Sequence, residues 1–342
     1  MARGKSDYLM ERIQHIDIKA FDARPVVQAM GKMAFEARNL HRAAEIYEAM
    51  LREPDGAVIL CLAGSLVSAG LKRLFADLIR NCMADVVVST GANLVDQDFF
   101  EGLGFRHYIG TPRVDDQELR RLGIDRIYDT FIDEDELRVC DMEVAKLAAE
   151  LAPRPYSSRE FLAAMGRRLA ARGDGEDGIL LAAREMGVPV FCPAFSDCSA
   201  GFGLVHHQWE RRGEPHVSID SARDFLELTE IKMAARETGL LMIGGGAPKN
   251  FAQDTVVASE MLGDPAPMHK YAVQLTVADQ RDGALSGSTL REACSWGKVD
   301  TAFEQIVFGE ATTTLPLLAS AVYHGGAWRG RRPRRFAERF PA

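Results

Sequence analysis

Short apolar runs rich in β-branched residues alternate along this chain with longer segments of helical periodicity, and this alternation restricts the fold more than any other feature. Buried strands are predicted at 57–62, 85–88, 188–191, 240–243, 271–276 and 305–308, with a weaker run at 126–131. Helices are predicted at 66–81, 134–149, 158–171, 179–186 and 221–238. Strands that alternate with helices in this way predict an α/β fold with a doubly wound, mostly parallel sheet.

Composition excludes several classes of protein. The 342 residues carry 41 Lys and Arg against 49 Asp and Glu, a net charge of −8, which argues against a nucleic-acid-binding surface. No apolar run approaches the roughly 20 residues of a membrane helix, and the first residues lack the apolar core of a signal peptide. The six cysteines are scattered without CxxC spacing, so reduced thiols and a cytoplasmic location are expected, with no membrane partner.

No linker or change of composition interrupts the chain between Val58 and Ala321, so one large domain is predicted over residues 34–326. Residues 1–33 are interpreted as an N-terminal helical extension. Residues 327–342 form a basic tail with Arg329, Arg331, Arg332, Arg334, Arg335 and Arg339. Two interpretations of this tail remain open: a mobile, solvated segment, or a contact for an anionic partner or a neighbouring subunit.

Two motifs in the sequence do not indicate a functional site. The GxGxxG pattern at 173–178 follows a predicted helix instead of a strand, and its variable positions are acidic, so a turn between helices is predicted there. The adjacent His206 and His207 would point to opposite faces of a strand, and no third ligand has suggestive spacing. No metal site is predicted.

Small and polar residues gather where the predicted strands end. Gly64 and Ser65 follow the first strand, Ser89 and Thr90 end the second, and three consecutive glycines at 244–246 follow the strand at 240–243. Asp197, after the strand at 188–191, is placed to accept hydrogen bonds from ribose hydroxyls. Because parallel sheets bind ligands beyond the carboxyl ends of their strands, these residues favour a nucleotide-sized ligand on a Rossmann-like sheet.

A second candidate site lies in the segment 282–298. Glu292, Trp296 and Lys298 fall within seven residues of one another. A carboxylate can bind an ammonium, an indole face can hold a cation or an alkyl chain, and a lysine can attack an imine or a carbonyl carbon. A surface Glu–Lys pair beside a core tryptophan is the alternative interpretation.

Together these segments resemble deoxyhypusine synthase over residues 34–322. The resemblance rests on Ser295-Trp296-Gly297-Lys298 with Glu292 upstream, on the glycines 244–246 followed by Lys249, and on Pro193-Ala194 with Asp197. It also includes the segments 85–93 and 307–318.

The resemblance implies an NAD-dependent transferase. In that family NAD takes a hydride from spermidine, a lysine captures the aminobutyl group as an imine, and the group passes to a lysine of a translation factor. Lys298 matches the capturing lysine, Trp296 the tunnel indole and Glu292 an anchoring carboxylate. The expected cofactor contacts are Gly64, Ser65, Ser89, Thr90, Asp96, Asp197, Gly245, Gly246, Thr276, Glu310 and Ala311. Family members are homotetramers, dimers of dimers, with sites at the subunit interfaces.

Several positions depart from the family pattern, and they surround the expected amine tunnel. Phe202 and Leu285 stand where the family has aspartates, Leu285 just before Ser286. Asn250 and Asp254 replace a histidine and an asparagine, and Ser65 replaces another asparagine. Because burying unpaired ammonium groups is costly, the loss of two anchors predicts weak spermidine binding.

The predicted substrate residues are therefore Glu292, Trp296, Asn250, Phe202, Leu285 and Ser286, with Lys298 catalytic. The expected activity is transfer of an alkylamine group to a small amine, as in homospermidine formation, typical of the bacterial deoxyhypusine synthase-like branch. One alternative is deoxyhypusine synthase itself. Another is an NAD-binding protein or amine dehydrogenase that performs no transfer.

Overall fold

The computed structural model describes residues 4–173, 177–235 and 237–340. Its main sheet has six strands, every neighbouring pair parallel, in the order β11-β10-β9-β1-β2-β7. The strands are β1 (Gly56–Leu62), β2 (Val86–Ser89), β7 (Val190–Phe191), β9 (Glu237–Ile243), β10 (His269–Thr276) and β11 (Val299–Phe308). The chain moves outward from β1 to β2 and β7 and then returns to the other side of β1 for β9 to β11. This order is that of a dinucleotide-binding sheet, and it reverses between β1 and β9.

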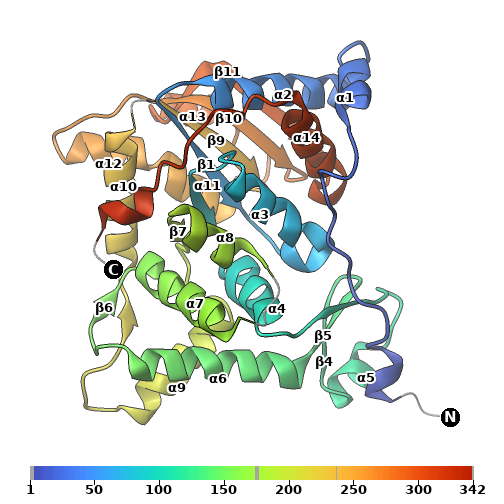
Figure 1. Cartoon of the computed structure of the whole chain (residues 1–342), viewed down its shortest axis with the longest axis vertical. Helices are drawn as coiled ribbons and strands as arrows, with labels where there is room; N and C mark the ends of the chain where they lie inside the picture. Colours follow the sequence, from blue (N-terminus) through green and yellow to red (C-terminus); the bar gives the residue numbers. More distant parts are fainter. Residues whose placement is uncertain (1–3, 174–176, 236, 341–342) are drawn as a thin grey trace.

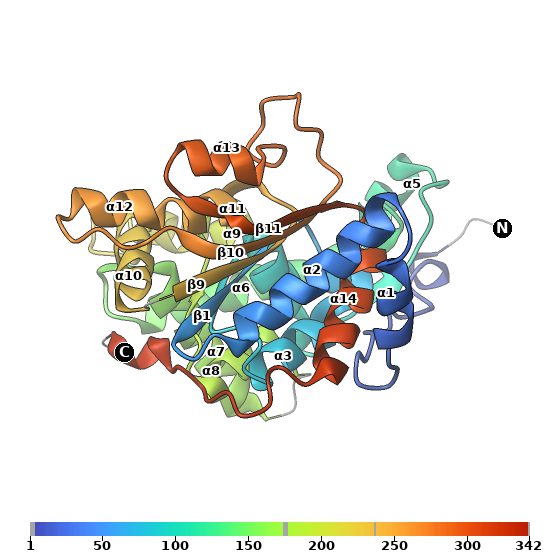
Figure 2. The same cartoon turned by 90° about the horizontal axis from the view of Figure 1, so that it is seen from above.

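Both faces of the sheet are apolar because both are covered by helices. On β1, Val58, Leu60 and Leu62 pack into one hydrophobic core, whereas Ile59 and Cys61 pack into a second core on the opposite face. Figure 2 shows the two layers. One contains α2 (Phe35–Arg52), α3 (Lys72–Arg80) and α14 (Ala311–Gly325), and the other α10 (Ser221–Ala234), α11 (Gly246–Gln253), α12 (Thr255–Met261) and α13 (Leu290–Ser295). The predicted doubly wound α/β fold is confirmed.

Most of the remaining elements extend the core at one end, in the lower part of Figure 1, whereas the helix at Arg24–Met30 lies beside α2 and α14 in the upper part. The helices are α1 (Arg24–Met30), α4 (Phe100–Gly102), α5 (Asp116–Arg121), α6 (Glu134–Glu150), α7 (Ser158–Arg172), α8 (Ile179–Met186) and α9 (Ser199–Glu210). Minor strands are β3 (His107–Ile109), β4 (Ile124–Ile127), β5 (Thr130–Asp133), β6 (Pro155–Tyr156) and β8 (Ser218–Ile219). Short 3₁₀ and π turns cover Lys5–Asp7, Phe336–Arg339, Val67–Leu71 and Ala92–Phe99. Within 4–33, helical turns occupy only Lys5–Asp7 and Arg24–Met30.

Three predicted elements differ from the structure. The run 126–131 is a hairpin of β4 and β5, because Tyr128 adopts a positive φ of 50° and reverses the chain. The predicted helix 221–238 ends at Ala234, and β9 already begins at Glu237. His206 and His207 lie in helix α9, not in a strand. Residues 174–176 of the GxGxxG pattern lie outside the described residues; Gly173 caps α7 with a left-handed φ of 72°.

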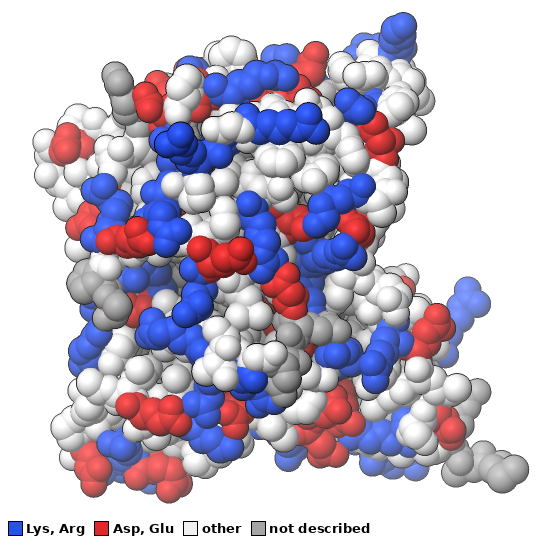
Figure 3. Space-filling view, in the orientation of Figure 1, with Lys and Arg blue, Asp and Glu red and all other residues white. Residues whose placement is uncertain are grey.

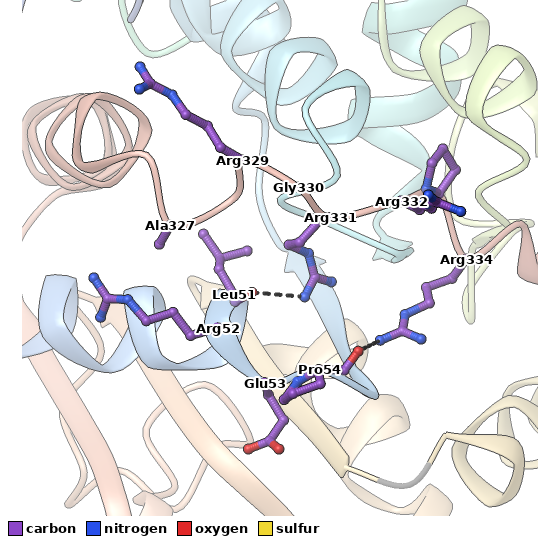
Figure 4. Close-up of a pocket in the computed structure, with 11 residues that line it drawn as sticks. Leu51, Arg52, Glu53, Pro54, Ala327, Arg329, Gly330, Arg331, Arg332 and Arg334 are labelled. Atoms are coloured by element: carbon purple, nitrogen blue, oxygen red, sulfur yellow. Dashed lines mark hydrogen bonds between the residues drawn. The ribbon is translucent and has the colours of Figure 1, made fainter.

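The basic tail packs against the domain, so a mobile, solvated tail is wrong for its described part, 327–340. The Arg331 guanidinium pairs with the buried Asp85 carboxylate at 2.6 Å and donates to the Leu51 carbonyl at 3.2 Å (Figure 4). Arg334 donates to the Pro54 carbonyl at 2.6 Å. Phe336 is buried in the hydrophobic core on the α10–α13 face. The tail thus passes the amino end of β1 and ends on the other face of the sheet.

Figure 3 shows basic and acidic side chains interspersed over one face of the molecule. Among the helices that the structure describes, none combines the length and apolar character needed to cross a membrane. All six cysteines are free thiols, and Cys61, Cys82, Cys140 and Cys192 are buried.

Candidate active site

The predicted cofactor residues lie along one edge of the main sheet. Glu310 follows β11, Thr276 ends β10, the glycines 244–246 follow β9, Gly64 follows β1 and Ser89 ends β2. Since neighbouring parallel strands end at the same edge, these residues form a row in the order of the strands. The row crosses the reversal point between β9 and β1, where open α/β sheets leave a crevice for a ligand.

Hydrogen bonds between the turns hold the centre of this row together. The Ala63 amide donates to the Ile243 carbonyl at 2.9 Å, which joins the turns after β1 and β9. The Thr90 hydroxyl donates to the Gly64 carbonyl at 2.9 Å. Gly64 itself has a φ of +71°, and a Cβ there would meet nothing within 4 Å, so its backbone faces open space. A ligand can therefore approach the main chain closely at this point.

Asp96 and Asp197 lie at the β2–β7 end of the row. The Asp96 carboxylate accepts a hydrogen bond of 2.7 Å from the Ser199 amide at the start of α9. Burial raises the pKa of Asp96 to about 7, and the neighbouring Asp141 and Asp197 carboxylates act in the same direction. Asp197 is exposed, whereas Cys198 packs against the turn at Gly91. The exposed carboxylate is free to meet a ligand, while Asp96 orders the loop behind it.

The chemistry of these residues fits a dinucleotide. The open backbone at Gly64 suits a pyrophosphate, and the exposed Asp197 carboxylate suits the hydroxyls of a ribose. A Cβ on Gly245 would lie 2.6 Å from the Ser286 Cα, so the segment before α13 packs directly on the glycine turn. The Glu310 carboxylate is less available to a ligand, because it caps α14 by accepting a hydrogen bond from the Thr312 amide at 2.8 Å. Ala311 is the first residue of that helix.

A cavity of about 480 Å³ lies on the α10–α13 face of the sheet and contains Lys298. Four of the predicted substrate residues line it as well: Asn250, Leu285, Glu292 and Trp296. Two predicted residues do not. Ser286 lies beside the glycine turn, and Phe202 is 69 % exposed on α9, next to Asp125 and Asp141. Within one chain, Phe202 is therefore separate from the Lys298 cavity.

Other lining residues were not predicted from the sequence as site residues. Apolar side chains supply most of the wall: Phe225, Val257, Ala258, Met261 and Ala293. Asp254 adds a carboxylate. The comparison with the family pattern had already grouped Asp254 with Asn250 beside the expected amine tunnel, and both line this cavity.

Local capping places Lys298 at the start of β11. The Thr289 hydroxyl accepts from the Glu292 amide at 3.0 Å, and the Glu292 carboxylate accepts from the Thr289 amide at 3.3 Å, so the two residues form a capping box for α13. After α13, Gly297 turns the chain with a φ of +72°. The Lys298 carbonyl then accepts from the His269 amide at 2.9 Å, which joins it to β10.

The Lys298 side chain is 11 % exposed, and its Nζ contacts two polar side chains and one aromatic ring. Its Nζ pairs with the Asp254 Oδ1 at 2.5 Å and donates to the Asn250 Oδ1 at 3.4 Å. It also lies 5.2 Å from the centroid of the Trp296 ring, within the range of a cation–π contact. Asn250 in turn donates from Nδ2 to the Asp254 Oδ2 at 2.7 Å. Lysine, carboxylate and amide therefore form a closed triangle of contacts.

A second buried lysine lies close by. Lys249 is 1 % exposed, and its Nζ donates to the carbonyl and hydroxyl of Ser288 at 2.7 and 2.9 Å. Burial lowers the pKa of Lys249 to about 8; the Glu292 carboxylate opposes this shift, and Lys298 contributes to it. Glu292 thus faces a cationic neighbourhood although its own side chain is solvent-accessible.

His207, one of the two adjacent histidines on α9, makes a structural hydrogen bond. The His207 Nε2 accepts from the Val217 amide at 3.2 Å, which ties α9 to the loop after it. Across residues 4–173, 177–235 and 237–340, no group of three or more His, Cys, Asp or Glu side chains could hold a metal ion.

The chain matches known proteins along most of its length. The family model for deoxyhypusine synthase matches residues 25–322. The deoxyhypusine synthase-like protein of Chlorobaculum tepidum is 59 % identical over 333 residues, 97 % of this chain and 95 % of the relative. The protein of the same description from Coxiella burnetii is 56 % identical over 337 residues, 98 % of this chain and 96 % of the relative.

A solved structure shares the fold at low sequence identity. The crystal structure described as a deoxyhypusine synthase from Entamoeba histolytica superposes with a TM-score of 0.60 at 16 % identity, over 91 % of this chain and 97 % of the other. At that identity the likeness concerns the fold alone. The family-model match and the bacterial relatives carry the assignment: this chain belongs to the deoxyhypusine synthase family.

Proposed function

We propose that this protein is an NAD-dependent transferase that moves an alkylamine group from a polyamine-like donor, through an imine on Lys298, to an amine acceptor. The observation that carries the proposal is the position of the Lys298 Nζ. It lies in an apolar-walled cavity with an indole and two carboxylates, at the end of the helix that begins in the glycine turn. Asn250, which contacts Nζ, is four residues beyond Gly246, about 6 Å along the helix axis.

NAD, when bound, would accept a hydride from the carbon next to the donor nitrogen. The glycine turns and Asp197 would hold the dinucleotide, and Trp296 with the apolar wall would pack against the carbon chain of the donor. Lys298 would attack that carbon. Covalent capture of this kind divides one difficult transfer into two easier steps.

The charge of the cavity favours a donor with fewer cationic groups than spermidine. Of its two carboxylates, Asp254 is already paired with Lys298, so only Glu292 remains for a substrate ammonium. Leu285 and the other apolar side chains offer no partner to a second or third ammonium. Since an unpaired buried ammonium is costly, spermidine should bind weakly, and a small amine is the favoured acceptor.

The test combines product analysis with covalent trapping. Protein incubated with NAD and a panel of polyamines should form a new alkylated amine that mass spectrometry detects. Borohydride added during turnover should reduce the imine and leave the substrate carbon attached to Lys298 as a stable amine. Lys298→Ala should abolish trapping and transfer while leaving amine-dependent NADH formation measurable.

Lys270→Ala is the matched control, because it removes another lysine that pairs with a carboxylate, Glu53, at 2.7 Å. This variant should form as much borohydride-trapped adduct as the wild type. Transfer at near wild-type rate in Lys298→Ala would refute the covalent route. Modification of a protein lysine, with no small-molecule product, would instead identify deoxyhypusine synthase activity.

We also propose a homotetramer, as expected for this family. Helix α9 supports self-association, because Phe202, Val205 and Trp209 lie along one side of it and are 69, 67 and 59 % exposed. A second copy that covers this stripe would bury three large apolar side chains. Sedimentation should show an oligomer that Phe202→Asp weakens; a monomeric wild-type protein would contradict the proposal.

A further inference from the structure

Two departures from the family pattern, Asn250 and Asp254, lie against the reacting lysine. They are four residues apart, Asn250 within α11 and Asp254 at its junction with α12, and lie 48 and 44 positions from Lys298 respectively. The Lys298 Nζ is 2.5 Å from the Asp254 Oδ1. A carboxylate at this distance is in position to accept a proton from an ammonium.

We propose that Asp254 carries protons between Lys298 and the departing amine, and that Asn250 positions the carboxylate for this task. The inference rests on the proposed function, which supplies an oxidised donor with a protonated C=N bond. Lys298 must lose a proton before its nitrogen can attack, and Asp254 is the carboxylate that contacts Nζ. Asn250 donates to the other carboxylate oxygen at 2.7 Å and so leaves Oδ1 directed at Nζ.

The step balances without an oxidant or reductant. The Nζ–C bond forms, and the bond between that carbon and the departing nitrogen breaks. Two protons leave Nζ through the Asp254 Oδ1, and both are delivered to the departing nitrogen. At the start the charges are one ammonium on Lys298 and one donor iminium; at the end they are one iminium on Lys298 and one free ammonium. Asp254 begins and ends ionised.

The other charged groups around Lys298 are less suited to this role. Glu292 lines the same cavity, but its carboxylate closes the capping box with the Thr289 amide at 3.3 Å. Lys249, on α11, adds positive charge and no acceptor. Trp296 offers a π face and stabilises the ammonium form of Lys298 without removing a proton.

The first measurement is the pH dependence of Lys298 labelling, which needs no catalysis. Acetic anhydride modifies neutral amines, and peptide mass spectrometry reports modification at Lys298 from pH 6 to 11. A neighbouring carboxylate stabilises the ammonium, so Asp254→Asn should move the midpoint of labelling to lower pH. Asp77→Asn is the matched control, since Asp77 pairs with Lys19 at 2.6 Å, in a different contact. It should leave the Lys298 midpoint unchanged.

The second measurement is the rate at which the borohydride-trapped adduct forms in a single turnover. Loss of a general acid–base should slow trapping about 100-fold at pH 7 in Asp254→Asn, although more of Lys298 is then neutral. Asp254→Glu should recover part of the rate, and Asn250→Ala should lower it less than Asp254→Asn. Circular dichroism and thermal unfolding establish that each variant folds.

The outcomes separate the two proposals. An unchanged labelling midpoint, or trapping in Asp254→Asn within threefold of wild type, would overturn the proton-carrier role. If the wild type traps no amine at all, the proposed transfer fails together with this role, while the labelling shift still establishes or refutes the Lys298–Asp254 pairing.

Discussion

At the scale of single residues, this protein places several charged groups where water cannot reach them. Lys232 and Lys249 are buried lysines on the α10–α13 face, and burial lowers the pKa of each to about 8. Lys249 has Ser288 as a hydrogen-bond partner. Within the described residues, the Lys232 Nζ has none. An unpaired buried ammonium reduces stability, and the magnitude depends on pH.

Lys232 predicts a measurable pH dependence of stability. Its pKa is about 8 in the folded protein and 10.5 when unfolded, so the unfolded chain binds more protons between these values. Stability should therefore rise with pH from 8 to 10.5, by at most about 1.4 kcal/mol per pH unit for one group, and the gain is absent below about pH 8. Lys232→Met should raise the free energy of unfolding at pH 7 by about 1–3 kcal/mol.

Urea denaturation at pH 7, 8, 9 and 10 measures this slope. Lys146→Met, which changes an exposed lysine that pairs with Glu143, serves as the control and should keep the wild-type slope. An identical pH dependence in Lys232→Met and wild type would show that Lys232 does not titrate in this range.

At the scale of elements, six strands and the turns after them create the candidate cofactor site. The turn residues come from segments as far apart as Gly64 and Glu310, and the strand order alone brings them to one edge. The glycine turn at 244–246 has a second role, since α11 begins at Gly246 and carries Lys249 and Asn250 toward Lys298. One helix therefore connects the expected dinucleotide site with Lys298.

The role of Asp197 can be tested at this edge. Asp197→Ala should weaken NAD binding about 10- to 100-fold, because a charge-assisted hydrogen bond contributes about 1.5–3 kcal/mol. Isothermal titration calorimetry measures the affinity. Asp264→Ala, an equally exposed aspartate in the loop between α12 and β10, should bind NAD like the wild type. Equal affinities for Asp197→Ala and wild type would exclude Asp197 from the site.

At the scale of the whole molecule, the C-terminal tail joins the two faces of the sheet. It leaves α14 on one face, crosses the amino end of β1 and inserts Phe336 into the core on the other. The Arg331–Asp85 pair fixes this crossing. Burial raises the pKa of Asp85, whereas the Arg331 guanidinium acts in the opposite direction. The tail crosses the sheet at the amino end of β1, at the edge opposite to the candidate cofactor residues.

Arg331→Met should destabilise the protein by about 3–5 kcal/mol, because it leaves the buried Asp85 carboxylate uncompensated. The midpoint of urea unfolding reports the loss. Arg332→Met, at a neighbouring exposed arginine, should change stability by less than about 0.5 kcal/mol. The double variant Arg331→Met with Asp85→Asn should lose less than Arg331→Met alone; an additive loss would argue against a coupled pair.

The local pattern of the sequence was sufficient to predict much of the fold and part of the candidate site. Buried strands and helices follow from the spacing of apolar residues, and the polar or glycine residues after each strand are readable because they are adjacent in sequence. The family resemblance, carried by the segment around Lys298, was likewise visible and is confirmed.

Only the tertiary structure brought distant residues together. The pairing of Lys298 with Asp254 joins positions 44 residues apart, and that of Arg331 with Asp85 joins positions 246 apart. Nor could the sequence place Phe202 outside the Lys298 cavity, on an exposed side of α9. Secondary structure depends on near neighbours along the chain, whereas ion pairs and cavity walls depend on the order in which strands and helices pack.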